Sequence, residues 1–156
     1  MIDRALLVSR FDQLLPLAVE WAMEQEARIL REGVSLTNEE KVVARQAGVG
    51  QPERVRLLQV KTIPRPEHEA LEAACDAIDF LTPATRGLAL GYGIFVRTDC
   101  WRDAGLIAHE LVHTAQYERL GGIEGFLRQY LMECLTVGYP ESPLEQEAIT
   151  RSASVR

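Results

Sequence analysis

The sequence predicts a mostly helical α+β domain. Apolar residues recur at helical spacing over most of the chain, whereas only two segments, 54–63 and 88–97, have the composition or the alternation of β-strands. The 156 residues are enough for one domain with a substantial core. Apolar residues make up 47% of the chain and charged residues 26%, which is typical of a globular protein. We therefore expect a single domain over residues 1–156.

The first third of the chain is predicted to be helical. Apolar side chains recur near helical spacing over residues 3–32, and Gly33 follows as a stop. Pro16 is expected to break this stretch into a short helix and a longer one, because proline lacks the backbone donor that a helix needs. Thr37 is a suitable N-cap for the next helix, which should end near Ala47.

The middle of the chain contains both strand candidates. Residues 54–63 are rich in Val, Leu and Ile and predict a strand, and residues 67–80 predict a helix. Residues 88–97 alternate in a way that predicts one half-buried strand. Gly91 and Gly93 leave bare backbone on that strand, which indicates a bulge or the close approach of another chain.

Three further helices are predicted in the last third. The first covers about Asp99 to Leu120 and the second about Ile123 to Thr136. A last short helix begins at Pro143, since proline is well tolerated in a first turn, and Ser142 can cap it.

The acidic balance of the chain argues against two classes of partner. The formal net charge is −6, which does not suit a surface that binds nucleic acid or anionic lipid. No apolar run approaches the roughly 20 residues that a membrane helix requires. The first residues lack the basic start, apolar stretch and cleavage site of a secretory signal, so we expect a cytoplasmic protein.

The three cysteines do not suggest a disulfide framework. Cys75, Cys100 and Cys134 form an odd, sparse set without a CxxC pair. Each is interpreted as a small apolar residue. Cys100 lies just before a helix with metal-ligand chemistry, so a regulatory thiol near that site is the alternative for this residue.

Residues 109–113 read His-Glu-Leu-Val-His and carry the chemistry of the chain. Two histidines four positions apart lie on one face of a helix, about 6 Å apart, and can share one zinc ion. Glu110 follows the first histidine directly and can take a proton from a water molecule bound to the metal. His109, Glu110 and His113 therefore predict a catalytic zinc centre. The third histidine, His68, stands in a charged segment and is expected to be solvated.

This HExxH pattern resembles the zincins, a class of zinc metallopeptidases. The resemblance implies a minimal zincin-like core, made of a small sheet, the HExxH helix and a later helix with the third ligand. Residues 51–156 would form this metallopeptidase-like core. Residues 1–50 would be an added helical cap that could narrow access to the cleft.

The third ligand is expected to be a carboxylate. No third histidine follows at the metzincin spacing, where Gln116 and Arg119 stand instead. The segment at Glu145 resembles the ExEAD pattern of membrane-bound prenyl-protein and heat-shock zinc proteases and of small bacterial HExxH domains, which implies a gluzincin-type site with Glu145 as the ligand. Glu147 is the alternative. The family's aspartate falls on Ile149, so a carboxylate that would orient a ligand is missing or comes from elsewhere in the chain.

The resemblance implies hydrolysis of a peptide or amide bond. Glu110 would act as general base, and an extended peptide or protein substrate would pair with the strand at 88–97. Tyr139 is the first candidate for the group that stabilises the oxyanion, with Tyr117 and Arg151 as alternatives. Gln116 either hydrogen-bonds a ligand or is a polar residue at a helix edge.

Two other functions are compatible with the same residues. One is a non-catalytic metal-binding or protein-interaction module, in which zinc fixes the C-terminal helix and no position stays open for water. The other is a metal-free relative of the enzymes. Zinc suits two histidines and a carboxylate best, although iron or manganese could use the same ligands. The sequence does not predict the oligomeric state.

Overall fold

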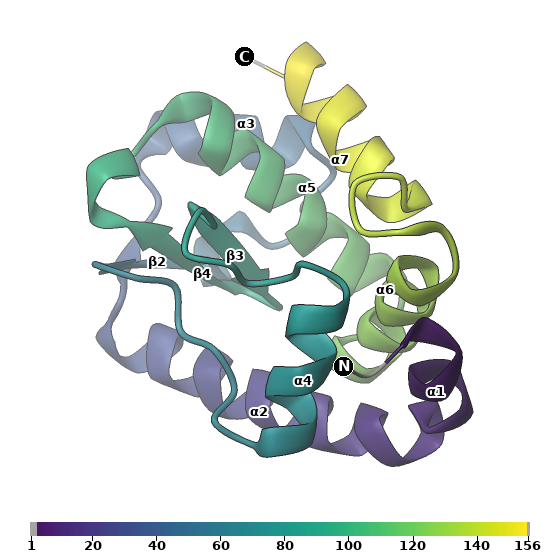
Figure 1. Ribbon diagram of the computed structural model, residues 1–156. Coiled ribbons are helices and arrows are strands. Elements are labelled where there is room, and N and C mark those ends of the chain that lie inside the picture. Colours follow the sequence, from purple (N-terminus) through teal and green to yellow (C-terminus); the bar gives the residue numbers. More distant parts are fainter. Residues whose placement is uncertain (1–2, 156) are drawn as a thin grey trace.

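The computed structural model describes residues 3–155 and confirms the mostly helical α+β class (Figure 1). Helices flank a small central sheet, and α2 and α5 lie on opposite sides of it. None of the described helices is both long and apolar enough to cross a membrane. The elements in chain order are α1 Arg4–Ser9, α2 Phe11–Glu32, β1 Val34–Ser35, α3 Asn38–Gln46, η1 Pro52–Arg54, β2 Arg56–Val60, α4 Glu69–Ala77, β3 Gly87–Leu90, β4 Gly93–Arg97, η2 Thr98–Cys100, α5 Ala104–Arg119, α6 Ile123–Val137 and α7 Pro143–Ser154.

The sheet has the strand order β1-β2-β4-β3. β2 and β4 pair in parallel, and β1 and β3 pair antiparallel to their neighbours. Leu57, Ile94 and Phe95 are fully buried at its centre. The segment expected to be a cap contributes β1 to this sheet and α2 to one of its faces. β3 is an edge strand, and α5 packs against it.

The prediction of one strand over residues 88–97 is wrong, because these residues form the hairpin of β3 and β4. Gly91 adopts a φ of +65°, which glycine takes without strain, and the backbone N–H of Tyr92 donates to Glu26 of α2 at 2.9 Å. Gly93 allows α2 to pack closely against the strand, since a Cβ at this position would lie 2.8 Å from the Cβ of Ile29. The close approach inferred from the glycines therefore comes from a helix of the same chain.

The prediction that Pro16 breaks the first helix is also wrong. Pro16 lies inside α2, and the break between α1 and α2 falls at Arg10. The backbone carbonyl that a residue at position 16 would normally reach belongs to Asp12. Both Pro16 and Asp12 are exposed, so water can satisfy that carbonyl and the loss is tolerated.

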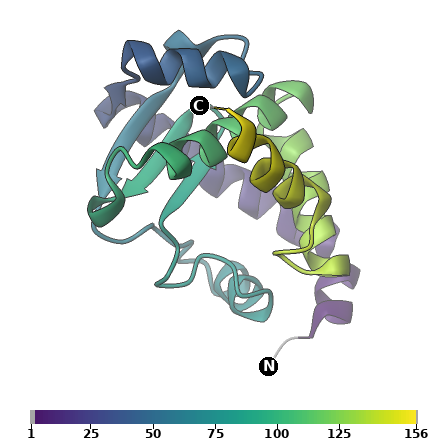
Figure 2. The same cartoon turned by 90° about the horizontal axis from the view of Figure 1, so that it is seen from above.

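The helix that carries His109 and His113 starts later than predicted. Residues 98–100 form a 3₁₀ turn, and α5 begins at Ala104. The Asp103 side chain caps α5 by accepting from the backbone N–H of Leu106 at 2.8 Å. α5 ends at Arg119, and α7 lies beside it (Figure 2).

The contact between Gly93 and α2 predicts a steric cost for any side chain at this position. Gly93→Ala should lower the free energy of unfolding by about 1–3 kcal/mol, because the added methyl group overlaps Ile29. Gly105→Ala is the matched control, since Gly105 is exposed and its Cβ would meet nothing closer than 3.5 Å. Urea denaturation of both variants measures the difference. Equal stability of the two variants would contradict the close contact.

Candidate metal centre

α5 presents a face of buried polar side chains, which is unusual for a helix inside a core. From Leu106 to Tyr117 every residue except His109 is buried. The rings of His109 and His113 lie on one face with their centroids 4.9 Å apart. This is the arrangement that the four-residue spacing predicts.

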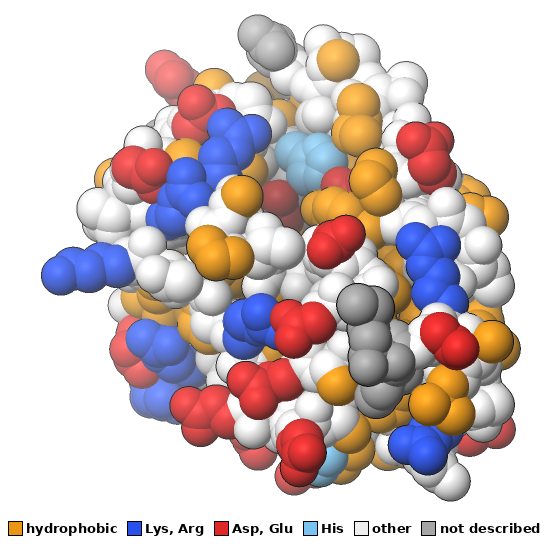
Figure 3. Space-filling view, in the orientation of Figure 1, with side chains coloured by type: hydrophobic (Ala, Val, Ile, Leu, Met, Phe, Trp, Pro, Cys, Tyr) orange, Lys and Arg blue, Asp and Glu red, His pale blue; other side chains and the backbone are white. Residues whose placement is uncertain are grey.

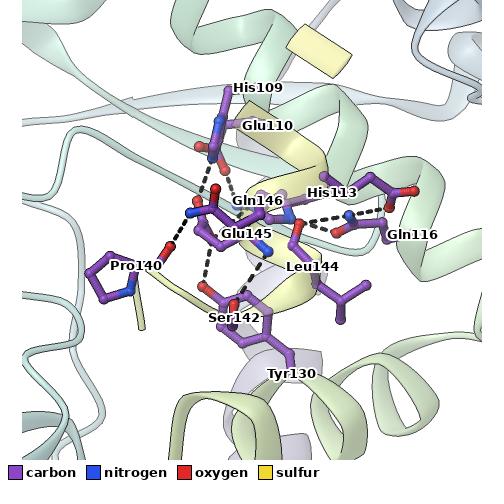
Figure 4. A network of polar contacts seen from close by, with 12 residues as sticks. His109, Glu110, His113, Gln116, Tyr130, Pro140, Ser142, Leu144, Glu145 and Gln146 are labelled. Atoms are coloured by element: carbon purple, nitrogen blue, oxygen red, sulfur yellow. Dashed lines mark hydrogen bonds and ion pairs between the residues drawn. The ribbon is translucent and has the colours of Figure 1, made fainter. Parts of the chain in front are cut away.

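Glu145 comes from the first turn of α7 and meets both histidines (Figure 4). Its Oε1 lies 2.7 Å from Nε2 of His109, and its Oε2 lies 3.3 Å from Nε2 of His113. Ser142 caps α7 and fixes this turn by accepting from the backbone N–H of Glu145 at 3.3 Å. One ligand atom from each of the three residues lies within 4.8 Å of the others. In a tetrahedral zinc site, bonds of about 2.0–2.1 Å place ligand atoms roughly 3.4 Å apart, so a small rearrangement fits the ion.

Gln116 fixes which nitrogen of His113 faces Glu145. The side-chain nitrogen of Gln116 donates to the backbone carbonyl of Leu144 at 2.9 Å, so its Oε1 faces Nδ1 of His113 at 2.7 Å. Nδ1 must then donate, and Nε2 presents its lone pair to the site whenever His113 is neutral. Hydrogen bonds of this kind orient metal-ligating histidines in known sites. Gln116 is fully buried, so it is not a polar residue at a helix edge. It is a hydrogen-bond partner of His113.

Glu147 does not join the histidines. It accepts from Gln116 at 2.6 Å and from Arg119 at 2.9 Å. The ion pair with Arg119 lowers the pKa of Glu147. Position 149, where the ExEAD pattern has an aspartate, is an exposed isoleucine and supplies no carboxylate to the site.

Tyr130 of α6 joins the cluster formed by the two histidines and Glu145, and it was not predicted. Its hydroxyl donates to Oε2 of Glu145 at 2.8 Å, and the residue is buried. The sequence contains one usable signal, since a tyrosine among the apolar residues of a helix needs a partner for its hydroxyl. That signal does not identify the partner, because Glu145 is 15 residues away in another helix.

Glu110 is buried beside the edge strand. Its Oε1 accepts from the backbone N–H of Ala89 at 3.1 Å. Burial raises the pKa of Glu110 above its ordinary value, although His113 and His109 oppose the shift. A carboxylate with a raised pKa is a better proton acceptor, as a general base must be.

The three candidates for oxyanion stabilisation have different surroundings. Tyr139 is half-buried and lines the same cavities as His109 and Glu110. The hydroxyl of Tyr117 donates to the backbone carbonyl of Ala89 at 3.0 Å and is therefore occupied. Arg151 contacts the backbone carbonyl of Gln46 at 3.4 Å, away from the histidines.

Two cavities meet at the cluster. An outer groove of about 440 Å³ is bounded by Arg86, Gly105 and Ser152, among others. An inner cavity of about 320 Å³ extends between α2, α4, α6 and β3. Both reach His109, Glu110, Tyr139 and Glu145. Figure 3 shows the outer side of this arrangement, where a histidine stands at the rim of a hollow that contains acidic atoms.

The two tryptophans of the chain have different surroundings, since Trp21 lines the inner cavity and Trp101 is half-buried just before α5. His68 is exposed and caps α4 by accepting from the backbone N–H of Ala70. All three cysteines are free, and Cys75 lines the inner cavity, where burial raises its pKa to about 11. Cys100 is half-buried and does not line either cavity.

No protein-family model, curated protein or solved structure matches this chain. Within residues 3–155, His109, His113 and Glu145 form a group that could hold a metal ion, with His109 half-buried and the other two buried. Their donor atoms are two imidazole nitrogens and a carboxylate oxygen, a set that is typical of zinc.

The hydrogen bond from Tyr130 to Glu145 predicts an effect on metal affinity. Tyr130→Phe should weaken zinc binding about 10-fold, because it removes a group that orients a ligand. Tyr92→Phe is the matched control, since it removes a hydroxyl that donates to a different carboxylate, Glu118, at 2.6 Å. Competition with a zinc chelator measures both affinities. Wild-type affinity in Tyr130→Phe would contradict the role of this hydrogen bond.

Proposed function

We propose that the protein is a zinc-dependent hydrolase that cleaves a peptide or related amide bond. The observation that carries the proposal is the convergence of His109, His113 and Glu145 beside Glu110, at the point where two cavities meet. A purely structural site needs neither a base nor an open approach. The resemblance of the HExxH segment to the zincins also supports the proposed hydrolase.

Each residue has a role in the proposed reaction. His109, His113 and Glu145 hold the metal, with Gln116 and Tyr130 orienting two of these ligands. When bound, zinc lowers the pKa of a coordinated water molecule towards neutrality and polarises a carbonyl group. Glu110 accepts the proton of the attacking water and delivers it to the leaving amine.

Tyr139 is the proposed partner of the substrate carbonyl. It lies on the wall shared by the two cavities, together with His109 and Glu110. Burial raises its pKa well above the ordinary value, so the hydroxyl keeps its proton. A neutral hydroxyl can donate to a developing oxyanion.

The substrate would approach through the outer groove and along the edge of β3. Residues 86, 88 and 90 point their backbone groups towards β4, since the N–H of Arg97 donates to the carbonyl of Arg86. Ala89 faces outwards, but Glu110 and Tyr117 already occupy its N–H and carbonyl. Gly87 also faces outwards and lines both cavities. Strand addition by a peptide would therefore be centred on Gly87 and would be short.

The location that we propose is the cytoplasm. All three cysteines are free. Free thiols are the ordinary state in a reducing compartment.

Metal analysis tests the proposed ligands. The wild type should bind about one zinc ion per chain, and Glu145→Gln should lose most of it, because three protein ligands are typical of such a site. Glu147→Gln is the matched control, since Glu147 is in the same turn and pairs with Arg119 instead. Absence of zinc in the wild type after reconstitution would overturn the proposal. Loss of zinc in Glu147→Gln alone would move the third ligand there.

Activity tests the proposed base. Glu110→Gln should keep its zinc and lose about 10²–10⁴-fold in the hydrolysis rate, because amide nitrogen and oxygen do not accept this proton. The assay follows new primary amines released from a mixture of peptides and N-acyl amino acids. Hydrolysis by Glu110→Gln at the wild-type rate would exclude Glu110 as the base. A wild type that binds zinc but hydrolyses neither class would favour the non-catalytic metal-binding module.

A further inference from the structure

The inner cavity differs from the outer groove in its chemistry. Its walls are mainly aliphatic and aromatic side chains from α1, α2, α4, α6 and β3. The charged side chains on its described walls are His109, Glu110, His113 and Glu145 at the metal end, together with the exposed Asp79. A ligand that extends inwards from the cluster therefore meets an apolar surface.

Several polar groups on these walls are already occupied. The hydroxyl of Tyr117 donates to Ala89, and the hydroxyl of Tyr130 donates to Glu145. The backbone N–H of Ala89 donates to Glu110. A peptide that entered this cavity would bury most of its own N–H and carbonyl groups without partners, which is costly. A hydrocarbon chain has no such groups.

The volume of the cavity also exceeds that of one side chain. An engineered apolar cavity of about 150 Å³ holds a benzene molecule. The inner cavity, at about 320 Å³, is roughly twice as large. It is therefore suited to a longer apolar group that begins at the metal cluster.

We propose that the substrate is an N-acyl amide whose aliphatic acyl chain occupies the inner cavity. This inference rests on the proposed function. The amine part, an amino acid or a short peptide, would lie in the outer groove, where Arg86 and Ser152 offer polar contacts. Water adds to the acyl carbon, the C–N bond breaks, and the proton held by Glu110 passes to the amine. The products are a fatty carboxylate and a free amine.

Binding of uncharged alcohols tests the chain site without requiring catalysis. Hexanol, octanol and decanol are titrated into the full-length protein, with and without zinc, and the fluorescence of Trp21, which lines the cavity, reports binding. Affinity should rise roughly three- to fourfold for each added methylene group, because each one is transferred from water to an apolar wall. An affinity that does not depend on chain length would overturn the inference.

Two neighbouring alanines of α4 provide matched variants. Ala74 lines the cavity and Ala73 does not, although both are half-buried. Ala74→Phe should weaken decanol binding at least tenfold, because the ring fills the cavity, while Ala73→Phe should bind decanol as the wild type does. Ala18→Phe fills the same cavity from α2 and replaces Ala74→Phe if thermal unfolding shows that variant to be unfolded. Wild-type binding in the folded cavity-filling variant would overturn the inference.

The zinc measurement separates the two proposals. Decanol binding that is sensitive to Ala74→Phe, in a protein that takes up no zinc, would support the chain site and overturn the hydrolase. Zinc binding and peptide hydrolysis without binding of the alcohols would keep the hydrolase and overturn the acyl chain. Faster release of amine from decanoyl-glycine than from acetyl-glycine, lost in Ala74→Phe and kept in Ala73→Phe, would support both.

Discussion

The buried polar cluster of Glu110, His113 and Glu145, where α7 meets α5, is the constraint on which the rest of the structure depends. Glu110, His113 and Glu145 are each at most 6% exposed, and charged groups at such depth are stable only with partners. The cluster supplies them, since Glu145 contacts both histidines and Tyr130, and Glu110 accepts from the backbone of the edge strand. Hydrogen bonds from His109 and His113 outweigh the effect of burial and hold the pKa of Glu145 well below its ordinary value.

Meeting this constraint requires three parts of the fold to be in place. α7 must lie along α5 so that Glu145 reaches the histidines, and Gln116 ties the two helices together through the Leu144 carbonyl. α6 must bring Tyr130 against the same carboxylate. The β3–β4 hairpin must present its outer edge to α5, where Ala89 meets Glu110 and Tyr117. The site and the fold are therefore specified by the same contacts.

The accuracy of the sequence predictions follows the range of the interactions. The fold class and the pair His109 and His113 could be predicted because helical periodicity is local. Glu145 was inferred only through the resemblance to other zinc proteases. The contact of Tyr130 with Glu145 could not be inferred, since nothing local relates α6 to α7. The hairpin was missed because α2 covers one face of the sheet and α5 covers the other. Both faces of these strands are therefore apolar, and the pattern of apolar and polar residues does not show where the turn lies. Pro16 was misread because its effect depends on exposure, which the sequence does not give.

The charge of the cluster gives a physical reason for a cation at this position. Glu110 and Glu145 are two buried carboxylates near the same histidine, and their negative charge must be balanced. Burial opposes a proton on His113, but the hydrogen bond to Glu145 and the charge of Glu110 outweigh it, so the pKa of His113 is raised. The extra proton on His113 and a divalent ion at its Nε2 are alternative ways to provide the same positive charge. Because metal binding requires neutral imidazole, the proton and the metal ion compete for His113. Metal affinity therefore increases as the pH rises through the raised pKa of His113.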